Sequence, residues 1–143
     1  MYRSFAVLLF LCLFLLPYHA ISQINRNGMH LMEHYIPDHY KASPQNWAIV
    51  QDSREIIYVG NEGKVLEFDG QSWRSIPNDN GSYVRSLAVD SEGTVYVGSV
   101  GEFGYLKPNN SGKLEFFNLS THIDSSFRDV WKTYTHGDTI FYC

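Results

Sequence analysis

The chain has 143 residues, a formal net charge of −4 at pH 7 and two cysteines. Its basic residues form no cluster, and the cysteines, Cys12 and Cys143, lie far apart in the sequence. These features argue against a basic nucleic-acid-binding surface and against a small fold held together by disulfides.

Residues 1–22 have the pattern of a secretory signal peptide. Arg3 precedes an uninterrupted apolar run of 12 residues, Phe5–Leu16, and Ala20-Ile21-Ser22 forms a small-x-small cleavage site. The run is shorter than the ~20 residues that a membrane span needs. We therefore expect cleavage before Gln23 and export, with an uncleaved signal anchor as the alternative. Loss of Arg3 would change the net charge from −4 to −5.

Residues 23–46 form an N-terminal segment before a repeated region. Within it, Met29–Ile36 is expected to be a strand that completes the last sheet of a closed ring. His30 and His34 fit the metal-binding pattern H-x-x-E-H, which requires a rigid helix. Gly28 and Pro37 leave at most two helical turns, so we predict no metal and no cofactor. No helix is expected after the signal peptide.

Residues 47–143 repeat a pattern of short strands. Asp52, Tyr58 and Gly60 recur 38 residues later as Asp90, Tyr96 and Gly98. A period of ~40 residues built from short strands is typical of a β-propeller blade. The predicted strands are Trp47–Gln51, Glu55–Gly60, Lys64–Phe68 and Ser72–Ile76, then Val84–Val89, Thr94–Gly98, Phe103–Lys107 and Lys113–Asn118.

A third copy of the pattern is expected to begin at Phe127–Trp131 and to stop at Ile140–Cys143, within its second strand. The sequence thus predicts an all-β fold, a β-propeller of four-stranded antiparallel blades. The chain would be an N-terminal fragment of about two and a half blades, with blades 1 and 2 and the start of blade 3.

One stretch, Asp90-Ser91-Glu92-Gly93, is similar to the Asp box of sialidase propellers. That box has one residue between Asp and Gly, whereas this stretch has two. We therefore predict a plain β-turn.

The candidate site follows from the alternating direction of the strands. Loops after the second and fourth strands of a blade open on the same face, where propellers bind small ligands. Arg85 and Arg128 are expected at equivalent places in successive repeats, where they could hold an anionic ligand such as an acidic sugar. Pairing with neighbouring blades is the alternative for both, and no catalytic residue is predicted. The ligand-binding candidates on this face are Gln45, Asn46, Asn61, Glu62, Arg85, Glu102, Phe103 and Arg128.

Several phrases carry a resemblance to a known family. Gln45–Asp52, Tyr58–Gly63, Glu67–Trp73 and Gly101–Leu106 resemble the regulator-type propeller repeats of Bacteroidetes membrane sensors, the triple-tyrosine-motif proteins and hybrid two-component regulators. The resemblance covers about residues 28–142, although the second repeat lacks the Asp-Gly-x-x-Trp phrase. It implies a periplasmic propeller followed by an Ig-like domain, a membrane helix and a cytoplasmic histidine kinase or helix-turn-helix output.

The resemblance implies a ligand-sensing propeller on the periplasmic side of the inner membrane, in a protein of signal transduction or transcription regulation. A glycan or other small anionic molecule is the expected ligand. Membrane anchoring, any kinase activity and dimerisation would belong to downstream domains, and this segment itself is expected to be neither an enzyme nor a nucleic-acid binder. The alternatives are an exported propeller enzyme, such as a lyase or glycosidase, and a surface adhesion propeller.

Overall fold

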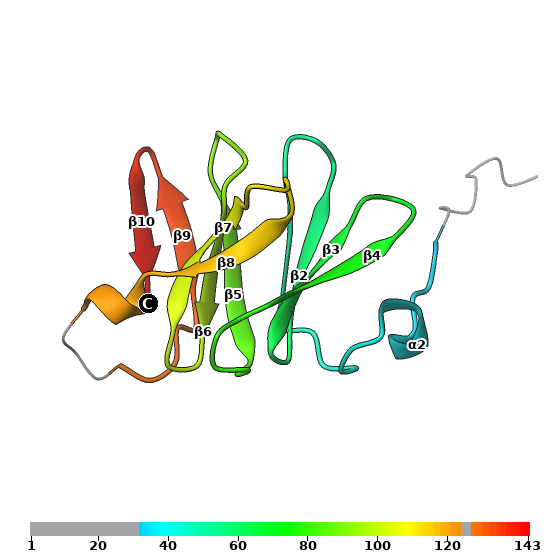
Figure 1. Ribbon diagram of the computed structural model, residues 1–143, viewed down its shortest axis with the longest axis horizontal. Helices are drawn as coiled ribbons and strands as arrows, with labels where there is room; N and C mark the ends of the chain where they lie inside the picture. Colours follow the sequence, from blue (N-terminus) through cyan, green and yellow to red (C-terminus); the bar gives the residue numbers. More distant parts are fainter. Residues whose placement is uncertain (1–31, 124–126) are drawn as a thin grey trace, which may run out of the picture. The chain divides into compact units, whose positions relative to one another are not determined.

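The computed structural model describes residues 32–123 and 127–143. The chain divides into two units, residues 1–33 and 34–143, and the second unit contains the helix and strands labelled in Figure 1. The predicted signal peptide lies outside the described residues, so its cleavage stays a prediction.

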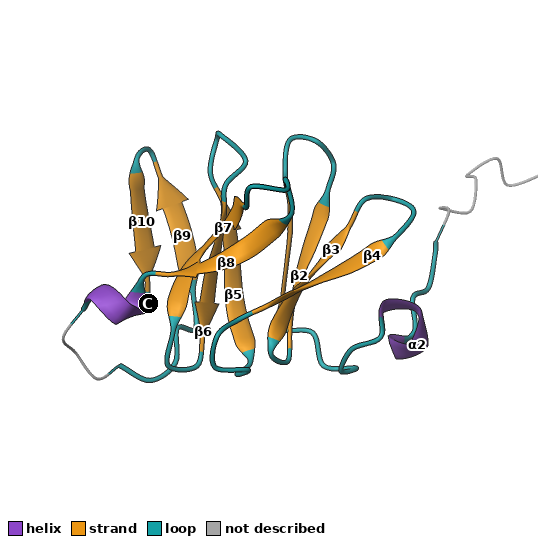
Figure 2. Ribbon diagram, viewed as in Figure 1, coloured by secondary structure: helices purple, strands orange, loops and turns teal. Residues whose placement is uncertain are grey.

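The second unit is built from antiparallel sheets whose strands follow one another in chain order (Figures 1 and 2). This confirms the predicted all-β class and its four-stranded antiparallel sheets. The observed strands begin and end within about two residues of the predicted ones. The first sheet contains β1 (Ala48–Gln51), β2 (Ile57–Asn61), β3 (Lys64–Phe68) and β4 (Trp73–Pro77), and the second contains β5 (Val84–Val89), β6 (Val95–Ser99), β7 (Phe103–Pro108) and β8 (Leu114–Asn118).

A two-stranded hairpin follows the second sheet. It consists of β9 (Thr133–His136) and β10 (Thr139–Tyr142), after a 3-10 turn at Ser120–His122. The third copy of the pattern was expected to begin at Phe127–Trp131, but these residues form only an isolated bridge between Asp129 and Val100 before β9 begins.

The core lies between the two four-stranded sheets. Alternate residues of a strand point to opposite faces, so one apolar row from each sheet meets the other. Tyr58 is fully buried in this cluster, and each buried apolar side chain contributes about 1.5–3 kcal/mol. The cluster consists of Tyr58, Val65 and Ile76 from the first sheet and Val84, Leu87, Val95, Val97 and Leu106 from the second.

The sheets approach closely at two glycines. A Cβ atom on Gly60 would lie 2.9 Å from Val84 Cγ1, and one on Gly98 would lie 2.5 Å from Val130 Cγ1. Glycine is therefore needed at both positions, 38 residues apart, for the next element to pack against the sheet. Val84 lies against Gly60 as Val130 lies against Gly98, so the two valines hold equivalent positions in successive repeats.

A one-turn helix, α2 (Pro37–Tyr40), precedes the first sheet. The prediction of no helix after the signal peptide is wrong here, because Pro37 is pre-organised for the first helical turn and Lys41 ends it at a φ of 49°. Tyr40 packs with Val59 and Leu66 on the first sheet. Residues 32–36 form no strand, and residues 29–31 lie outside the described residues, so the closing strand stays a prediction.

The hairpin turns at the upper end of the strands in Figure 1 are organised by Asp and Asn side chains. Asp90 Oδ1 accepts the backbone N–H groups of Glu92 and Thr94, at 2.9 and 2.8 Å. Gly93 N also donates to Asp90 O, which confirms the predicted β-turn. Asp52, Asp69 and Asn109 accept backbone N–H groups in the same way in the other turns.

Candidate functional site

The loops that carry the predicted ligand-binding residues lie at the lower end of the strands in Figure 2. The loops before β1, β5 and β9 meet the loops β2–β3 and β6–β7 at this end. Glu62 bridges to Tyr83 across two of these loops. The structure thus gathers the residues at one end of the sheets, as the alternation of strand direction predicted, while their role in binding stays a prediction.

At the centre of this end, the guanidinium group of Arg85 lies among three aromatic rings, which we call the Arg85 cluster: Trp47, Tyr83, Arg85 and Trp131. The Arg85 Cζ atom lies 3.9 Å from the ring centroid of Trp47, 4.6 Å from that of Trp131 and 5.2 Å from that of Tyr83. These are cation–π distances. The two tryptophan rings meet edge to face at 6.5 Å.

Arg85 is more buried than an arginine in a solvated channel would be. Its side chain is 14% exposed, and its Nη2 atom lies 3.9 Å from Asp129 Oδ2. The Nε and Nη1 atoms are buried and have no hydrogen-bond partner among the described residues. A guanidinium is not deprotonated in proteins, so both atoms keep their N–H groups, and these donors are unsatisfied within the described structure. The side chain therefore contacts its neighbours, as the alternative interpretation expected, and still has unused donors.

The equivalence predicted for Arg85 and Arg128 is wrong. Arg85 follows Val84, and the residue that follows the equivalent Val130 is Trp131. The backbone carbonyl of Arg128 accepts from Gly101 N, as that of Ser82 accepts from Gly63 N, so Arg128 corresponds to Ser82. The β8–β9 connection is longer than the β4–β5 connection, and this insertion shifted the sequence alignment by three residues.

Trp47 occupies the same position in the first sheet. Ala48 pairs with Gly60 as Ser86 pairs with Gly98, so the preceding residues, Trp47 and Arg85, are equivalent. Trp47, Arg85 and Trp131 thus stack side by side from three successive repeats. Sequence reasoning treated both tryptophans as packing residues, although the 38-residue offset between Trp47 and Arg85 was an available signal.

Asn61 is a structural residue that fixes the segment before β1. Its fully buried Nδ2 group lies within hydrogen-bond distance of Ser43 O, Gln45 O and Asn46 Oδ1, at 2.7, 3.1 and 2.6 Å. Its Oδ1 accepts from Ser43 N at 3.2 Å. The side chains of Gln45 and Asn46 are exposed beside this hub, whereas the Asn61 amide is fully used.

Glu102 fixes the next loop. Its buried carboxylate accepts from Asn80 N at 3.3 Å and from Asn118 Nδ2 at 3.1 Å. Burial raises the pKa of Glu102 above its usual range, and the nearby charge of Asp79 acts in the same direction. Glu102 is therefore a loop-positioning residue in this structure.

The remaining two candidates, Phe103 and Arg128, are not members of the Arg85 cluster. Phe103 packs against Phe127 and Tyr142, with centroids 5.3 and 4.4 Å apart. Arg128 is exposed, and its side chain makes no hydrogen bond, ion pair or cation–π contact with a described residue. Arg85 is thus the one predicted candidate that the described structure places inside the aromatic cluster.

No group of three or more His, Cys, Asp or Glu residues in the described ranges could hold a metal ion. Part of the H-x-x-E-H pattern, His30 and Leu31, lies outside those ranges. Among the described helices, none is long and apolar enough to cross a membrane.

Comparison with protein-family models, with curated proteins and with solved structures finds no match to this chain.

Proposed function

We propose that this chain forms part of a β-propeller that senses a small anionic ligand, a glycan or a similar molecule, on the periplasmic side of a membrane. Output domains outside this chain would convert binding into signal transduction or transcription regulation. Two observations support the propeller: consecutive four-stranded sheets in chain order, and innermost strands β1, β5 and β9 that neighbour one another. The resemblance to regulator-type propeller repeats supports the sensor role.

The observation that carries the ligand proposal is the Arg85 cluster. Trp47 is 40% exposed and Trp131 is 55% exposed, so both side chains are partly open to solvent beside a cation. A sugar ring can pack on such aromatic side chains, and an attached carboxylate is attracted by the nearby guanidinium. The unpaired donors of Arg85 indicate that internal stability alone does not explain this arrangement.

The test uses the full-length protein and two probes, glucuronic acid and glucose. Binding of each probe is measured by the change in tryptophan fluorescence. We expect the acid to bind and glucose to bind at least tenfold more weakly, because only the acid carries a charge for Arg85. Arg85→Lys should reduce the affinity for glucuronic acid about tenfold, since Lys keeps the charge but loses the planar donor array.

Arg128→Ala is the control, because this exposed arginine lies at the same end of the strands and its side chain makes no hydrogen bond, ion pair or cation–π contact with a described residue. It should bind glucuronic acid as the wild type does. Equal binding of both probes by the wild type, or equal losses in the two variants, would contradict the proposal. In cells, a sensor predicts that Arg85→Lys lowers the ligand-induced output and Arg128→Ala does not.

A further inference from the structure

A cleft opens at the other end of the strands from the Arg85 cluster, where the hairpin turns of the two four-stranded sheets face each other. Its volume is about 540 Å³, within the usual range for small-molecule sites. The β1–β2 turn contributes Arg54 on one side, and the β5–β6 turn contributes Glu92 on the other. Glu67 of β3 and Arg74 of β4 also line it, together with the apolar residues Ile56 and Leu106.

The two repeats differ in chemistry in the row of residues that reaches this cleft. In the second sheet, Tyr96, Tyr105 and Phe117 pair across β6, β7 and β8, with ring centroids 6.3 and 5.1 Å apart. The equivalent row in the first sheet is Tyr58, Glu67 and Arg74. A carboxylate and a guanidinium thus stand where the other repeat has two aromatic rings. Departures from a consistent pattern of this kind are expected at functional sites.

Glu67 is an uncommon residue for its position. It is 8% exposed, and its carboxylate has no hydrogen bond from any described residue. The nearest charge is Arg74 Nε, at 3.9 Å from Glu67 Oε2, which is an ion pair without a hydrogen bond. The Glu67 oxygens are not among the fully buried atoms without a partner, so they stay accessible from the cleft and can accept from a ligand that carries a donor.

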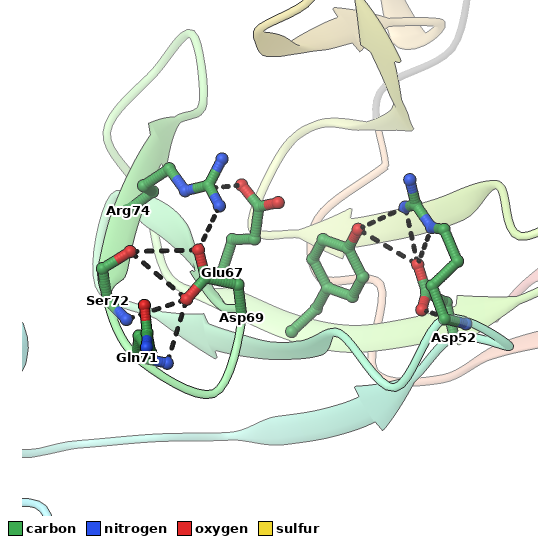
Figure 3. A network of polar contacts seen from close by, with 8 residues as sticks. Asp52, Glu67, Asp69, Gln71, Ser72 and Arg74 are labelled. Carbon is green, nitrogen blue, oxygen red and sulfur yellow. Dashed lines mark hydrogen bonds and ion pairs between the residues drawn. The ribbon is translucent and has the colours of Figure 1, made fainter.

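The two arginines of the cleft are held in place by aspartates. Arg74 Nη2 binds Asp69 Oδ2, and the same aspartate accepts the backbone N–H groups of Gln71 and Ser72 (Figure 3). Arg54 binds Asp52 Oδ2 through Nε at 3.0 Å and through Nη2 at 2.7 Å. Both guanidiniums stay more than half exposed, and their Nη1 groups make no hydrogen bond to a described residue. The cleft therefore has pre-positioned donors beside an accessible carboxylate that accepts no hydrogen bond from a described residue.

We infer that this cleft binds a small zwitterion of the α-amino-acid type. The ammonium group of the ligand donates to the Glu67 carboxylate at the floor. The ligand carboxylate accepts from the free N–H groups of Arg74, with Arg54 adding positive charge at the wall. The ammonium and carboxylate of an amino acid are attached to one carbon atom, which matches acceptor and donor groups as close as Glu67 and Arg74.

The test measures binding of three probes to the full-length protein by calorimetry: L-alanine, N-acetyl-L-alanine and L-alaninamide. The second probe lacks the ammonium group and the third lacks the carboxylate. We expect L-alanine to bind at millimolar concentration and each of the other two to bind at least tenfold more weakly. Failure of L-alanine to bind, or similar binding of all three, would overturn the inference with the wild type alone.

Two variants locate the site. Glu67→Gln keeps the shape of the side chain and should weaken L-alanine binding at least tenfold, whereas Asp138→Asn, in the exposed β9–β10 turn, should leave it unchanged. The double variant Glu67→Tyr, Arg74→Phe copies the second repeat and should keep the melting temperature while it abolishes binding. Undiminished binding by a folded Glu67→Gln or double variant would overturn the assignment. Arg85→Lys should not change L-alanine binding, which separates this site from the Arg85 cluster.

Discussion

The hydroxyl group of Tyr96 donates a hydrogen bond to Oδ2 of Asp90 at 3.0 Å, and so connects a turn to the strand that follows it. The other oxygen of Asp90 accepts two backbone N–H groups of the same turn. Asp52 and Tyr58 repeat this relationship in the first sheet, at 3.4 Å, where the guanidinium of Arg54 joins them. The repeated six-residue spacing of Asp and Tyr therefore has a physical cause.

Asp90→Ala should lower the free energy of unfolding by about 2 kcal/mol, because two backbone donors and one half-buried hydroxyl lose their acceptor. Chemical denaturation of the full-length protein measures this difference. Asp138→Ala, in the exposed turn of the β9–β10 hairpin, is the control and should change the value by less than about 0.5 kcal/mol. Equal effects of the two substitutions would show that the Asp–Tyr connection is not stabilising.

The second prediction concerns Glu102 and pH. Because burial raises its pKa in the folded protein, the folded state holds the proton to a higher pH than the unfolded state does. Ionised Glu102 therefore costs stability, and this cost appears as pH rises from the unfolded pKa, about 4.3, through the folded one. The sign is opposite to that for Asp90, whose pKa is lowered by its hydrogen bonds even though burial opposes this.

Comparison with Glu102→Gln isolates this effect, since the aspartates are present in both proteins. We expect the free energy of unfolding of the wild type, relative to that of Glu102→Gln, to decrease as the pH rises above the unfolded pKa of about 4.3. Denaturation curves of both proteins at several pH values measure it. A difference that stays constant, or that grows with pH, would contradict a raised pKa for Glu102.

Most of the sheet structure could be predicted because local signals and the repeat agree. Asp69-Gly70 marks a hairpin, and alternating apolar residues mark the strands on either side. The helix at Pro37–Tyr40 could not be predicted in this way, since one turn has no periodic pattern. It exists because Tyr40 packs against Val59 and Leu66, a tertiary contact that single-sequence reasoning does not see.

The candidate site could be predicted only in part. Strand alternation predicted which loops meet at one end, yet the apparent repeat made Arg85 and Arg128 equal candidates. Their difference depends on the long β8–β9 connection, which changes the register of the third repeat. The role of Asn61 was also hidden, because hydrogen bonds to a segment 15–18 residues away cannot be predicted from composition or spacing.

The last prediction concerns this buried asparagine. Asn61 uses its amide hydrogens on acceptors at Ser43, Gln45 and Asn46, so Asn61→Asp would place a carboxylate oxygen against those oxygens. We expect Asn61→Asp to be more destabilising than Asn61→Ala, by at least about 1 kcal/mol, because a buried carboxylate oxygen that faces three acceptor oxygens costs more than the lost hydrogen bonds do. In both variants, residues 43–46 should exchange their amide hydrogens faster, as measured by mass spectrometry. Asn78→Ala is the control in the β4–β5 loop, since Asn78 is similarly buried but donates to Ser82 and not to this segment. Unchanged exchange at residues 43–46 in Asn61→Ala would show that other contacts hold the segment in place.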